Sequence, residues 1–140
     1  MSAILTSTQS TSTTALRNST ELAGRILLAA IFLISGLGKI TGYEATAGYM
    51  AAMGVPTFLL PLVIATEVLG SLAIIAGFQT RIVAFLLAGF TLLTGAIFHS
   101  NLGDQIQMIM FLKNISIAGA FLILVANGAG AYSLDARKAN

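Results

Sequence analysis

The chain has 140 residues, enough for one domain, and contains no cysteine. Hydrophobic residues make up 56% of it and charged residues 9%, whereas ordinary soluble domains carry about 25% charged residues. So few charges cannot cover so much apolar surface in water, and a formal net charge of +2 is too small to indicate a nucleic-acid partner. The composition therefore indicates an integral membrane protein with the lipid bilayer as its surroundings, and it excludes disulfides and thiolate metal sites within this chain.

The N-terminal part combines a polar segment with a first apolar run. Residues 1–20 are rich in serine and threonine, which predicts a disordered cytoplasmic tail. Asn18 and Glu21 have the spacing of a helix-capping pair, so the first helix is predicted to begin there. The apolar run at residues 26–38 ends at Lys39. A signal peptide is the alternative for this segment, but no cleavage site of small residues follows it and further apolar segments do.

A short helix is predicted between the first and second spans. Thr41 and Glu44 have the spacing of a capping box, and residues 44–53 favour a helix because they are rich in alanine and methionine. Gly54 suits the left-handed end of a helix, and Pro56 prevents its continuation. This helix is expected to lie at the membrane surface.

Three longer apolar runs follow along the chain, at residues 58–78, 82–98 and 106–126. None shows the alternation of a transmembrane β-strand, and backbone groups in lipid must bond internally, which favours helices. The fold is therefore predicted to be all-α, an integral membrane four-helix bundle with one short interfacial helix. Residues 21–135 form this transmembrane domain, and residues 136–140 form a cytoplasmic tail.

The basic residues predict the orientation of the bundle, because lysine and arginine concentrate on the cytoplasmic side. With both termini in the cytoplasm, only Lys39 and Lys113 lie toward the other side. The remaining basic residues all face the cytoplasm: Arg17, Arg25, Arg81, Arg137 and Lys138.

Two charged residues interrupt the apolar runs. Glu67 lies about 13 Å and Lys113 about 10 Å below the outer face of the membrane. A charge near the bilayer centre costs about 2.5–3.5 kcal/mol, so neither should face lipid. We predict a Glu67–Lys113 ion pair inside the bundle, with Thr66 and Asn114 as hydrogen-bond partners. Such a pair is either a structural clamp that fixes helix register or part of a proton-handling or ligand-binding pocket.

Two further polar residues lie at the outer ends of spans. Lys39 ends the first span and His99 ends the third, so both are expected to close the outer end of the same pocket. Lys39 is explained as well by a side chain that extends to the membrane surface. His99 is either an interfacial residue or a proton relay, because the pKa of histidine lies near neutrality.

Five short segments occur in a characteristic order: Ser35-Gly36-Leu37-Gly38-Lys39, Glu67-Val68-Leu69-Gly70, Gly77-Phe78-Gln79-Thr80-Arg81, Phe98-His99 and Phe111-Leu112-Lys113-Asn114. Together they resemble the DoxX family, and within it the YqjF-like branch, over about residues 22–135. Ser71 departs from the family, which often has a second glycine there. The resemblance implies a multi-pass protein of the bacterial inner membrane. Because some relatives are subunits of a thiosulfate:quinone oxidoreductase, it also suggests a quinone-linked redox role.

Three functions are compatible with the sequence. The first is a membrane oxidoreductase component that binds a quinone or quinol, needs no intrinsic cofactor or metal, and exchanges electrons with a soluble or membrane redox partner. In this hypothesis Glu67 and His99 are catalytic residues that exchange protons, and Lys39, Lys113 and Asn114 bind the ligand. The second is a small proton-coupled exporter that uses Glu67. The third is a non-enzymatic scaffold or assembly partner, and a homo-oligomer is compatible with each of the three.

Overall fold

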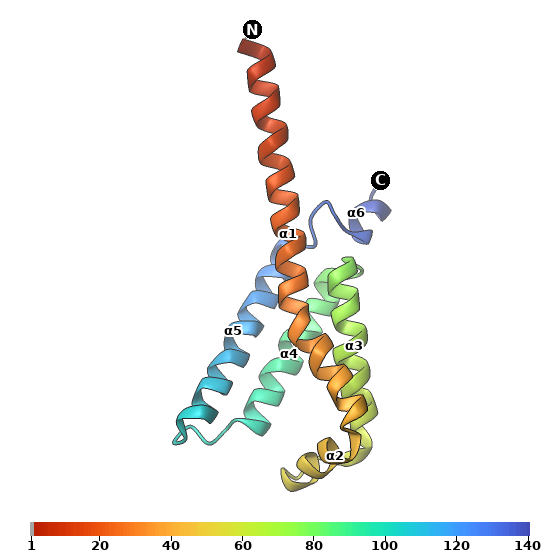
Figure 1. Ribbon diagram of the computed structural model, residues 1–140, viewed down its shortest axis with the longest axis vertical. Coiled ribbons are helices and arrows are strands. Elements are labelled where there is room, and N and C mark those ends of the chain that lie inside the picture. Colours follow the sequence, from red (N-terminus) through yellow and green to blue (C-terminus); the bar gives the residue numbers. More distant parts are fainter. Residues whose placement is uncertain (1) are drawn as a thin grey trace.

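The computed structural model describes the backbone of residues 2–140 and the side chains of residues 11–140. Within this part of the chain the elements follow in the order α1 (Ser2–Thr41), α2 (Tyr43–Ala52), η1 (Thr57–Leu59), α3 (Leu60–Ala76), α4 (Thr80–Phe98), α5 (Gln105–Asn127) and α6 (Leu134–Lys138) (Figure 1). Four stretches are long and apolar enough to cross a membrane: Thr11–Thr41, Thr57–Ala76, Thr80–Phe98 and Gln105–Asn127. The prediction of four spans with a short helix between the first two is confirmed.

Local signals in the sequence set several helix ends. Gly54 follows α2 with φ 75°, and Gly77 ends α3 with φ 70°, both in the left-handed region that favours glycine. Asp104 caps α5 by accepting a hydrogen bond of 2.9 Å from the backbone N–H of Gln107. The helix end expected at Gly54 is confirmed, and Gly77 and Asp104 set two further helix ends.

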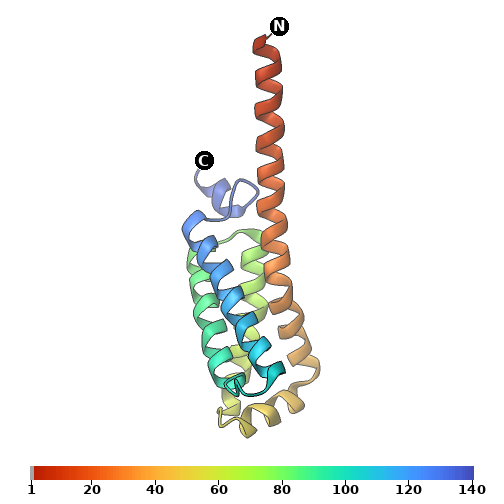
Figure 2. The same cartoon turned by 90° about the vertical axis from the view of Figure 1, so that its left-hand side faces the viewer.

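The capping box expected at Thr41 and Glu44 is wrong. Helix α1 continues to Thr41, whose hydroxyl donates to the carbonyl of Gly38 at 3.0 Å. Gly42 is the residue that precedes α2, and no side chain caps that helix. The chain turns at Gly42, so that α2 lies across the end of the bundle (Figure 2).

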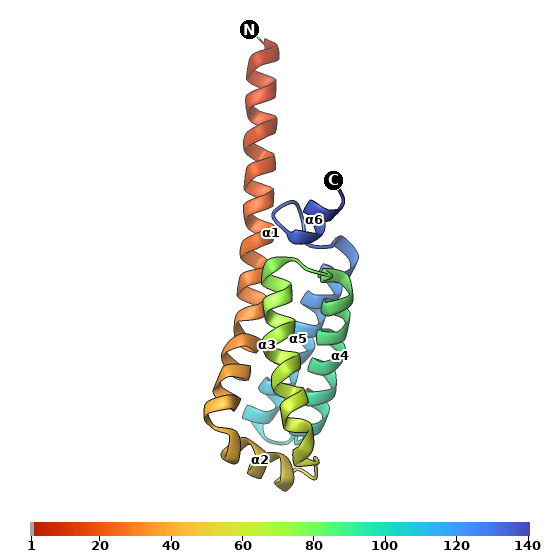
Figure 3. The ribbon, with the colours of Figure 1, turned by 90° about the vertical axis from the view of Figure 1, so that its right-hand side faces the viewer.

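The disordered tail expected at residues 1–20 is wrong for the described part, because α1 is one helix from Ser2 to Thr41. Its first half projects beyond the bundle (Figure 3). Asn18 and Glu21 lie inside this helix, and the Arg17 guanidinium contacts Glu21 at 3.0 Å, one turn apart. Adding residues to an existing helix is far easier than starting one, so the polar residues can extend the helix of the apolar span.

The spans pack as two pairs, α1 with α3 and α4 with α5. The pairs diverge away from the end that holds both termini, and α2 lies at the divergent end (Figure 1). Gly36 brings α1 close to α3, because a Cβ there would lie 2.7 Å from Cγ2 of Val68. The two pairs meet in a buried apolar core, where the rings of Phe32 and Phe121 lie 5.4 Å apart.

A buried arginine ties the terminal end of the bundle together. Arg25 is 2% exposed and donates from Nη1 to the carbonyls of Ile74 and Ile75, at 3.0 and 2.8 Å. Its Nη2 donates to the carbonyl of Tyr132. The last carbonyls of a helix have no partner within the helix, and a cation there also complements the helix dipole. Arg25 therefore joins the end of α3 to the segment before α6.

Arg81 binds the C-terminal carbonyls of α5 in the same way. Its Nη1 donates to the carbonyls of Val125 and Ala126 at 2.9 and 2.8 Å. The sequence indicates only that a basic residue follows the second span. The structure shows that this residue, at the start of α4, also satisfies the C-terminal carbonyls of α5.

The polar tail predicted at residues 136–140 is instead largely part of a docked element, α6. The backbone N–H of Asp135 donates to the carbonyl of Gly77 at 2.9 Å. The carboxylate accepts from the backbone N–H groups of Gln79 and Thr80 at 2.8 and 2.9 Å. Asp135 thus caps the start of α4 from a distant part of the chain, and α6 packs onto the bundle.

We expect Gly77→Ala to lower the free energy of unfolding by about 2–3 kcal/mol. The added Cβ would require a strained φ and would lie 2.7 Å from Nη1 of Arg25. Gly89→Ala is the matched control, because a Cβ at Gly89 meets nothing within 4 Å. Thermal unfolding in detergent micelles measures both variants, and equal unfolding midpoints would contradict this account of the α3 end.

We expect Asp135→Asn to lower the free energy of unfolding by about 1–2 kcal/mol at neutral pH. Burial by itself would raise the pKa of Asp135, but hydrogen bonds from Thr80 and Gln79 and the charge of Lys138 outweigh it and lower the pKa below its ordinary value. The folded protein therefore prefers the ionised carboxylate. Its contribution is full above about pH 5 and is lost as the pH falls below the unfolded value of about 3.9.

Unfolding midpoints of wild type and Asp135→Asn across pH 3 to 7 check this expectation, with the two curves converging at the acidic end. Glu44→Gln serves as the control, because Glu44 is an exposed carboxylate in the first turn of α2. A difference between wild type and Asp135→Asn that grows on acidification would refute the capping role.

Candidate functional site

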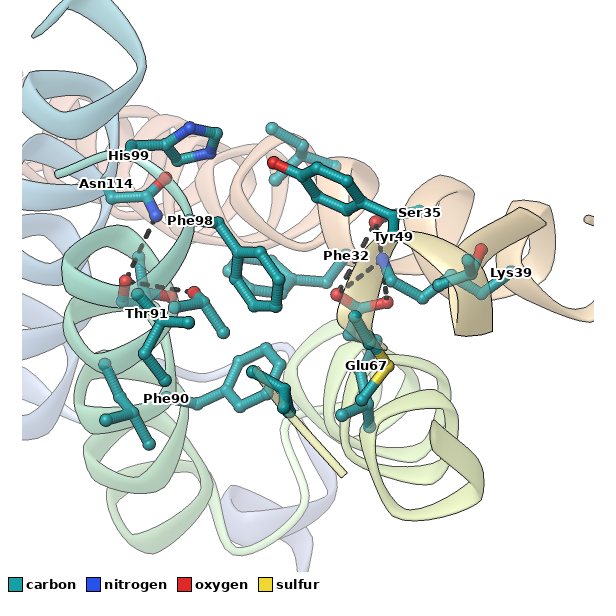
Figure 4. A pocket seen from close by; sticks show the side chains of 18 of the residues that line it. Phe32, Ser35, Lys39, Tyr49, Glu67, Phe90, Thr91, Phe98, His99 and Asn114 are labelled. Carbon is teal, nitrogen blue, oxygen red and sulfur yellow. Dashed lines mark hydrogen bonds and ion pairs between the residues drawn. The ribbon is translucent and has the colours of Figure 1, made fainter. Parts of the chain in front are cut away.

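A cavity of about 620 Å³ lies between the two helix pairs at the end where they diverge. Its walls come from α1, α2, α3, α4 and α5 (Figure 4). Most of the lining is apolar and includes four aromatic side chains: Phe32, Tyr49, Phe90 and Phe98. The volume falls in the range of about 300–1,000 Å³ that is typical of small-molecule sites.

The residues predicted from the sequence to form the site all line this cavity: Lys39, Glu67, His99, Lys113 and Asn114. These five residues lie on α1, α3 and α5 and at the end of α4. Their catalytic and ligand-binding roles stay predictions, but their convergence on one cavity is a property of the fold.

An ion pair occupies one wall. Lys39 Nζ lies 2.9 Å from Oε2 and 3.1 Å from Oε1 of Glu67, and their side chains are 24% and 8% exposed. Lys39 Nζ also donates to the Ser35 hydroxyl at 2.6 Å, and that hydroxyl lies 3.5 Å from Oε1 of Glu67. Ser35 and Lys39 are four residues apart and so share one face of α1. A serine, a lysine and a glutamate therefore form one connected polar group.

The predicted Glu67–Lys113 pair is wrong. The partner of Glu67 is Lys39, because α3 packs along α1 and not along α5. Lys113 lines the cavity from α5, is exposed, and makes no ion pair within the described part of the chain. Thr66 is not a partner of Glu67 either, since its hydroxyl donates to the carbonyl of Leu62 at 2.8 Å.

The facing wall carries the second group of polar residues. Asn114 Nδ2 donates to the carbonyl of Thr91 at 3.1 Å and so joins α5 to α4. The Thr94 hydroxyl donates to the same carbonyl at 3.1 Å. His99 Nδ1 lies 2.9 Å from Oε1 of Gln107, across the turn between α4 and α5.

Figure 4 shows how the two walls face each other. Lys39 and Glu67 lie on one side of the cavity, and Thr91, Asn114 and His99 lie on the other. The aromatic rings lie between the two sides: Phe32, Phe90 and Phe98. The arrangement is an apolar gap with polar groups at both edges.

Helix α2 covers the divergent end of the cavity and contributes Tyr49 and Met50 to its lining. The Tyr49 ring stacks on the Phe98 ring at the end of α4, with centroids 5.4 Å apart. The expected interfacial helix therefore also forms part of the site.

The cavity also opens sideways onto apolar surface. Ile31 from α1 and Leu93 from α4 line it and are 40% and 60% exposed. Both belong to stretches that are apolar enough to cross a membrane, so lipid would cover them in a bilayer. The cavity therefore borders surface that lipid would cover.

Sequence reasoning missed four hydroxyl residues that line the cavity: Ser35, Thr46, Thr91 and Thr94. The spacing between Ser35 and Lys39 is a signal that was present, because residues four apart lie on one helix face. No comparable signal marks Thr91 and Thr94, because the rotation of α4 about its axis decides which of its residues face inward.

Comparisons with known proteins show which family the chain belongs to. The sequence pattern of the DoxX family matches residues 20–100, which include Lys39, Glu67 and His99. Inner membrane protein YqjF of Escherichia coli (strain K12) is 56% identical over 84 residues, which cover 60% of this chain and 65% of YqjF. Inner membrane protein YphA of the same strain is 44% identical over 93 residues, which cover 61% of this chain and 66% of YphA. The chain therefore spans slightly less than two thirds of the length of these curated relatives, and no solved structure matches it.

We expect Lys39→Met to lower the free energy of unfolding by about 3 kcal/mol, because it leaves the carboxylate of Glu67 unpaired in an apolar region. Glu67→Gln should cost less, since the long side chain of Lys39 can extend toward the membrane surface. The double variant Lys39→Met/Glu67→Leu should recover most of the loss, because it leaves no unpaired charge.

Thermal unfolding in detergent micelles compares these variants with Lys113→Met. Lys113 lies outside the pair, so its replacement leaves no charge unpaired and should not lower the stability. A loss in Lys113→Met as large as that in Lys39→Met would restore the pairing first predicted from the sequence.

Proposed function

The chain belongs to the DoxX family of membrane proteins, and on this basis we propose that its cavity binds a quinone or quinol drawn from the bilayer. The chain is an inner-membrane protein with four apolar helices, and the proposal gives this bundle a role in redox chemistry. The observation that carries the proposal is the cavity itself: its lining is mostly apolar, part of that lining belongs to the exposed apolar surface of the spans, and it has polar groups on two facing walls.

The chemistry of the ligand suits these walls. A quinone is a flat apolar ring with oxygen atoms at opposite edges, usually with an apolar tail. The rings of Phe32, Phe90 and Phe98 offer surfaces for the apolar ring, and Lys39 and Glu67 offer polar atoms at one edge. Small-molecule sites are typically apolar with a few placed polar groups. The side opening toward lipid accommodates the tail.

Reduction of a quinone takes up protons together with electrons, so the site needs groups that exchange protons. In this proposal Glu67 is one such group, since Lys39 and Ser35 fix the position of its carboxylate. His99 is the second, because its hydrogen bond to Oε1 of Gln107 places a proton on Nδ1 and leaves Nε2 as the accepting nitrogen. The electrons are proposed to come from a soluble or membrane redox partner.

The orientation of the chain is also part of the proposal. Both termini lie at the end of the bundle away from the cavity (Figure 1). Most of the basic residues belong to segments at that end, which favours the cytoplasm for it. The cavity then lies in the outer half of the inner membrane.

Isothermal titration calorimetry with a decyl-substituted benzoquinone, on purified protein in detergent micelles, tests the proposal. We expect saturable binding by the wild type and at least about ten-fold weaker binding by Glu67→Gln. Glu44→Gln is the control, because Glu44 is exposed on α2 and does not line the cavity. Titrations of the wild type that fail to saturate would refute quinone binding.

The exchange variant Lys39→Glu/Glu67→Lys separates a ligand site from a structural clamp. It keeps an ion pair but moves the cation to the deeper position on α3, so we expect recovered stability without recovered quinone binding. A scaffold would need the pair alone and would regain full function. A drug-resistance phenotype that Glu67→Gln abolishes, without any effect of quinone, would favour export instead.

A further inference from the structure

We infer that the ligand of the cavity is an anion, a quinone with an acidic ring hydroxyl, whose negative oxygen binds the side chain of Lys113. The inference rests on the proposed quinone site and narrows the class of quinone that the site takes. It follows from the charges of the cavity lining and from a lysine there that has no partner within the described part of the chain.

Lys113 lines the cavity from α5 and is accessible to a molecule inside it. Asn114 and Ile117, one position and one turn further along α5, line the cavity as well. Residues at this spacing share one side of a helix, so this side of α5 faces the cavity. Lys113 is exposed, whereas Asn114 beside it is buried. The lysine side chain is therefore open to contact by a ligand.

Lys113 differs from the other charged residues of the four membrane-length stretches. It forms no hydrogen bond and no ion pair with any residue that the structure describes. The others all have partners within the chain: Arg17 with Glu21, Lys39 with Glu67, and Arg25 and Arg81 with backbone carbonyls. The chain itself thus supplies a partner for every charge in the spans except this one.

The position of Lys113 makes a missing partner unfavourable. It lies about 12 Å along the helix axis from Gln105, the first residue of α5. Ionisable residues at membrane depth usually pair with a group of opposite charge, because an isolated charge there is costly. A lysine can reduce this cost by extending to the membrane surface, but in the structure Lys113 lines the cavity. A negative group of the ligand would supply the partner there.

The charges of the lining add up to a positive value. Lys39 and Glu67 cancel each other, because they form an ion pair at 2.9 Å. Lys113 adds one positive charge, and protonation of His99 would only add to it. Among the described residues, no other aspartate, glutamate, lysine, arginine or histidine lines the cavity. Attraction between charges is stronger in apolar surroundings than in water, so the lining favours an occupant with one negative charge.

A quinone with a hydroxyl directly on its ring carries this charge. The hydroxyl is acidic, because the negative charge left behind is shared with a ring carbonyl oxygen, whereas the corresponding methyl ether stays neutral. An ammonium group donates a short, strong hydrogen bond to a negatively charged oxygen. The cost of holding Lys113 in the membrane is already present in the empty protein, so on binding only the ligand gives up water.

The test compares two ligands by calorimetry at pH 8 in nonionic detergent micelles. The first is 2-hydroxy-3-undecyl-1,4-naphthoquinone, which is ionised at this pH, and the second is its neutral methyl ether. We expect the wild type to prefer the ionised ligand, and Lys113→Met to reduce this preference by at least about ten-fold. The affinity for the methyl ether should stay unchanged. Because each variant is measured with both ligands, their different solubility in the micelle cancels.

Two control variants isolate the charge at this position. Lys113→Arg keeps a cation and should retain the preference for the ionised ligand. Lys138→Met makes the same chemical change on α6, at an exposed lysine outside the cavity, and should leave both affinities unchanged. Without ligand, Lys113→Met should unfold at a temperature no lower than the wild type, because it leaves no charge unpaired.

An anionic phospholipid headgroup is the other source of a negative charge for Lys113. We expect the wild type to keep its preference for the ionised naphthoquinone in micelles that contain a small fraction of phosphatidylglycerol. Loss of the preference with phosphatidylglycerol, but not with phosphatidylcholine, would assign Lys113 to a lipid headgroup and overturn the inference.

The remaining contrary results separate the inference from the proposed function. An equal preference in wild type and Lys113→Met, or equal weakening of both ligands by the substitution, would overturn the role of Lys113 and leave the quinone site intact. A lower unfolding temperature of ligand-free Lys113→Met would show a structural role and overturn the inference as well. An absence of saturable binding of either ligand by the wild type would overturn both the inference and the proposed function.

Discussion

The ion pair between Lys39 and Glu67 is the constraint on which the divergent end of the bundle depends. A single charge at membrane depth costs about 2.5–3.5 kcal/mol, so each residue needs the other. Their contact at 2.9 Å requires α1 and α3 to lie side by side with these faces together. Gly36 permits that approach, because α3 occupies the space that a side chain on α1 would need. The pair thus fixes one wall of the cavity.

The two ends of the bundle are held by different means. At the terminal end, Arg25, Arg81 and Asp135 bind backbone groups at helix ends, which ties α3, α4, α5 and the last segment together. At the other end the helix pairs separate, and the space between them is covered by α2 and lined by polar residues. A bundle tied firmly at one end can stay open at the other. This division places the proposed ligand site away from the contacts that stabilise the fold.

Sequence reasoning predicted the spans and the residues of the site, because hydropathy, glycine turns and buried charges are local signals. It predicted the wrong partner for Glu67. The rise per residue gives the depth of Glu67, Lys39 and Lys113, but neither the neighbour of α3 nor the rotation of each helix follows from depth. The docked end of the chain was missed for a related reason. Asp135 and Arg25 bind backbone atoms, and backbone atoms carry no signature in the sequence.

The divergent end is not arranged for stability alone. Buried ion pairs can often be replaced by apolar residues without loss, and well-packed interiors rarely leave large spaces unfilled. Here an ion pair and a cavity of about 620 Å³ occur together. A polar-edged apolar ligand would fill the space and contact the ion pair at its edge. A scaffold role accounts for the ion pair, but it gives no reason for the space beside it.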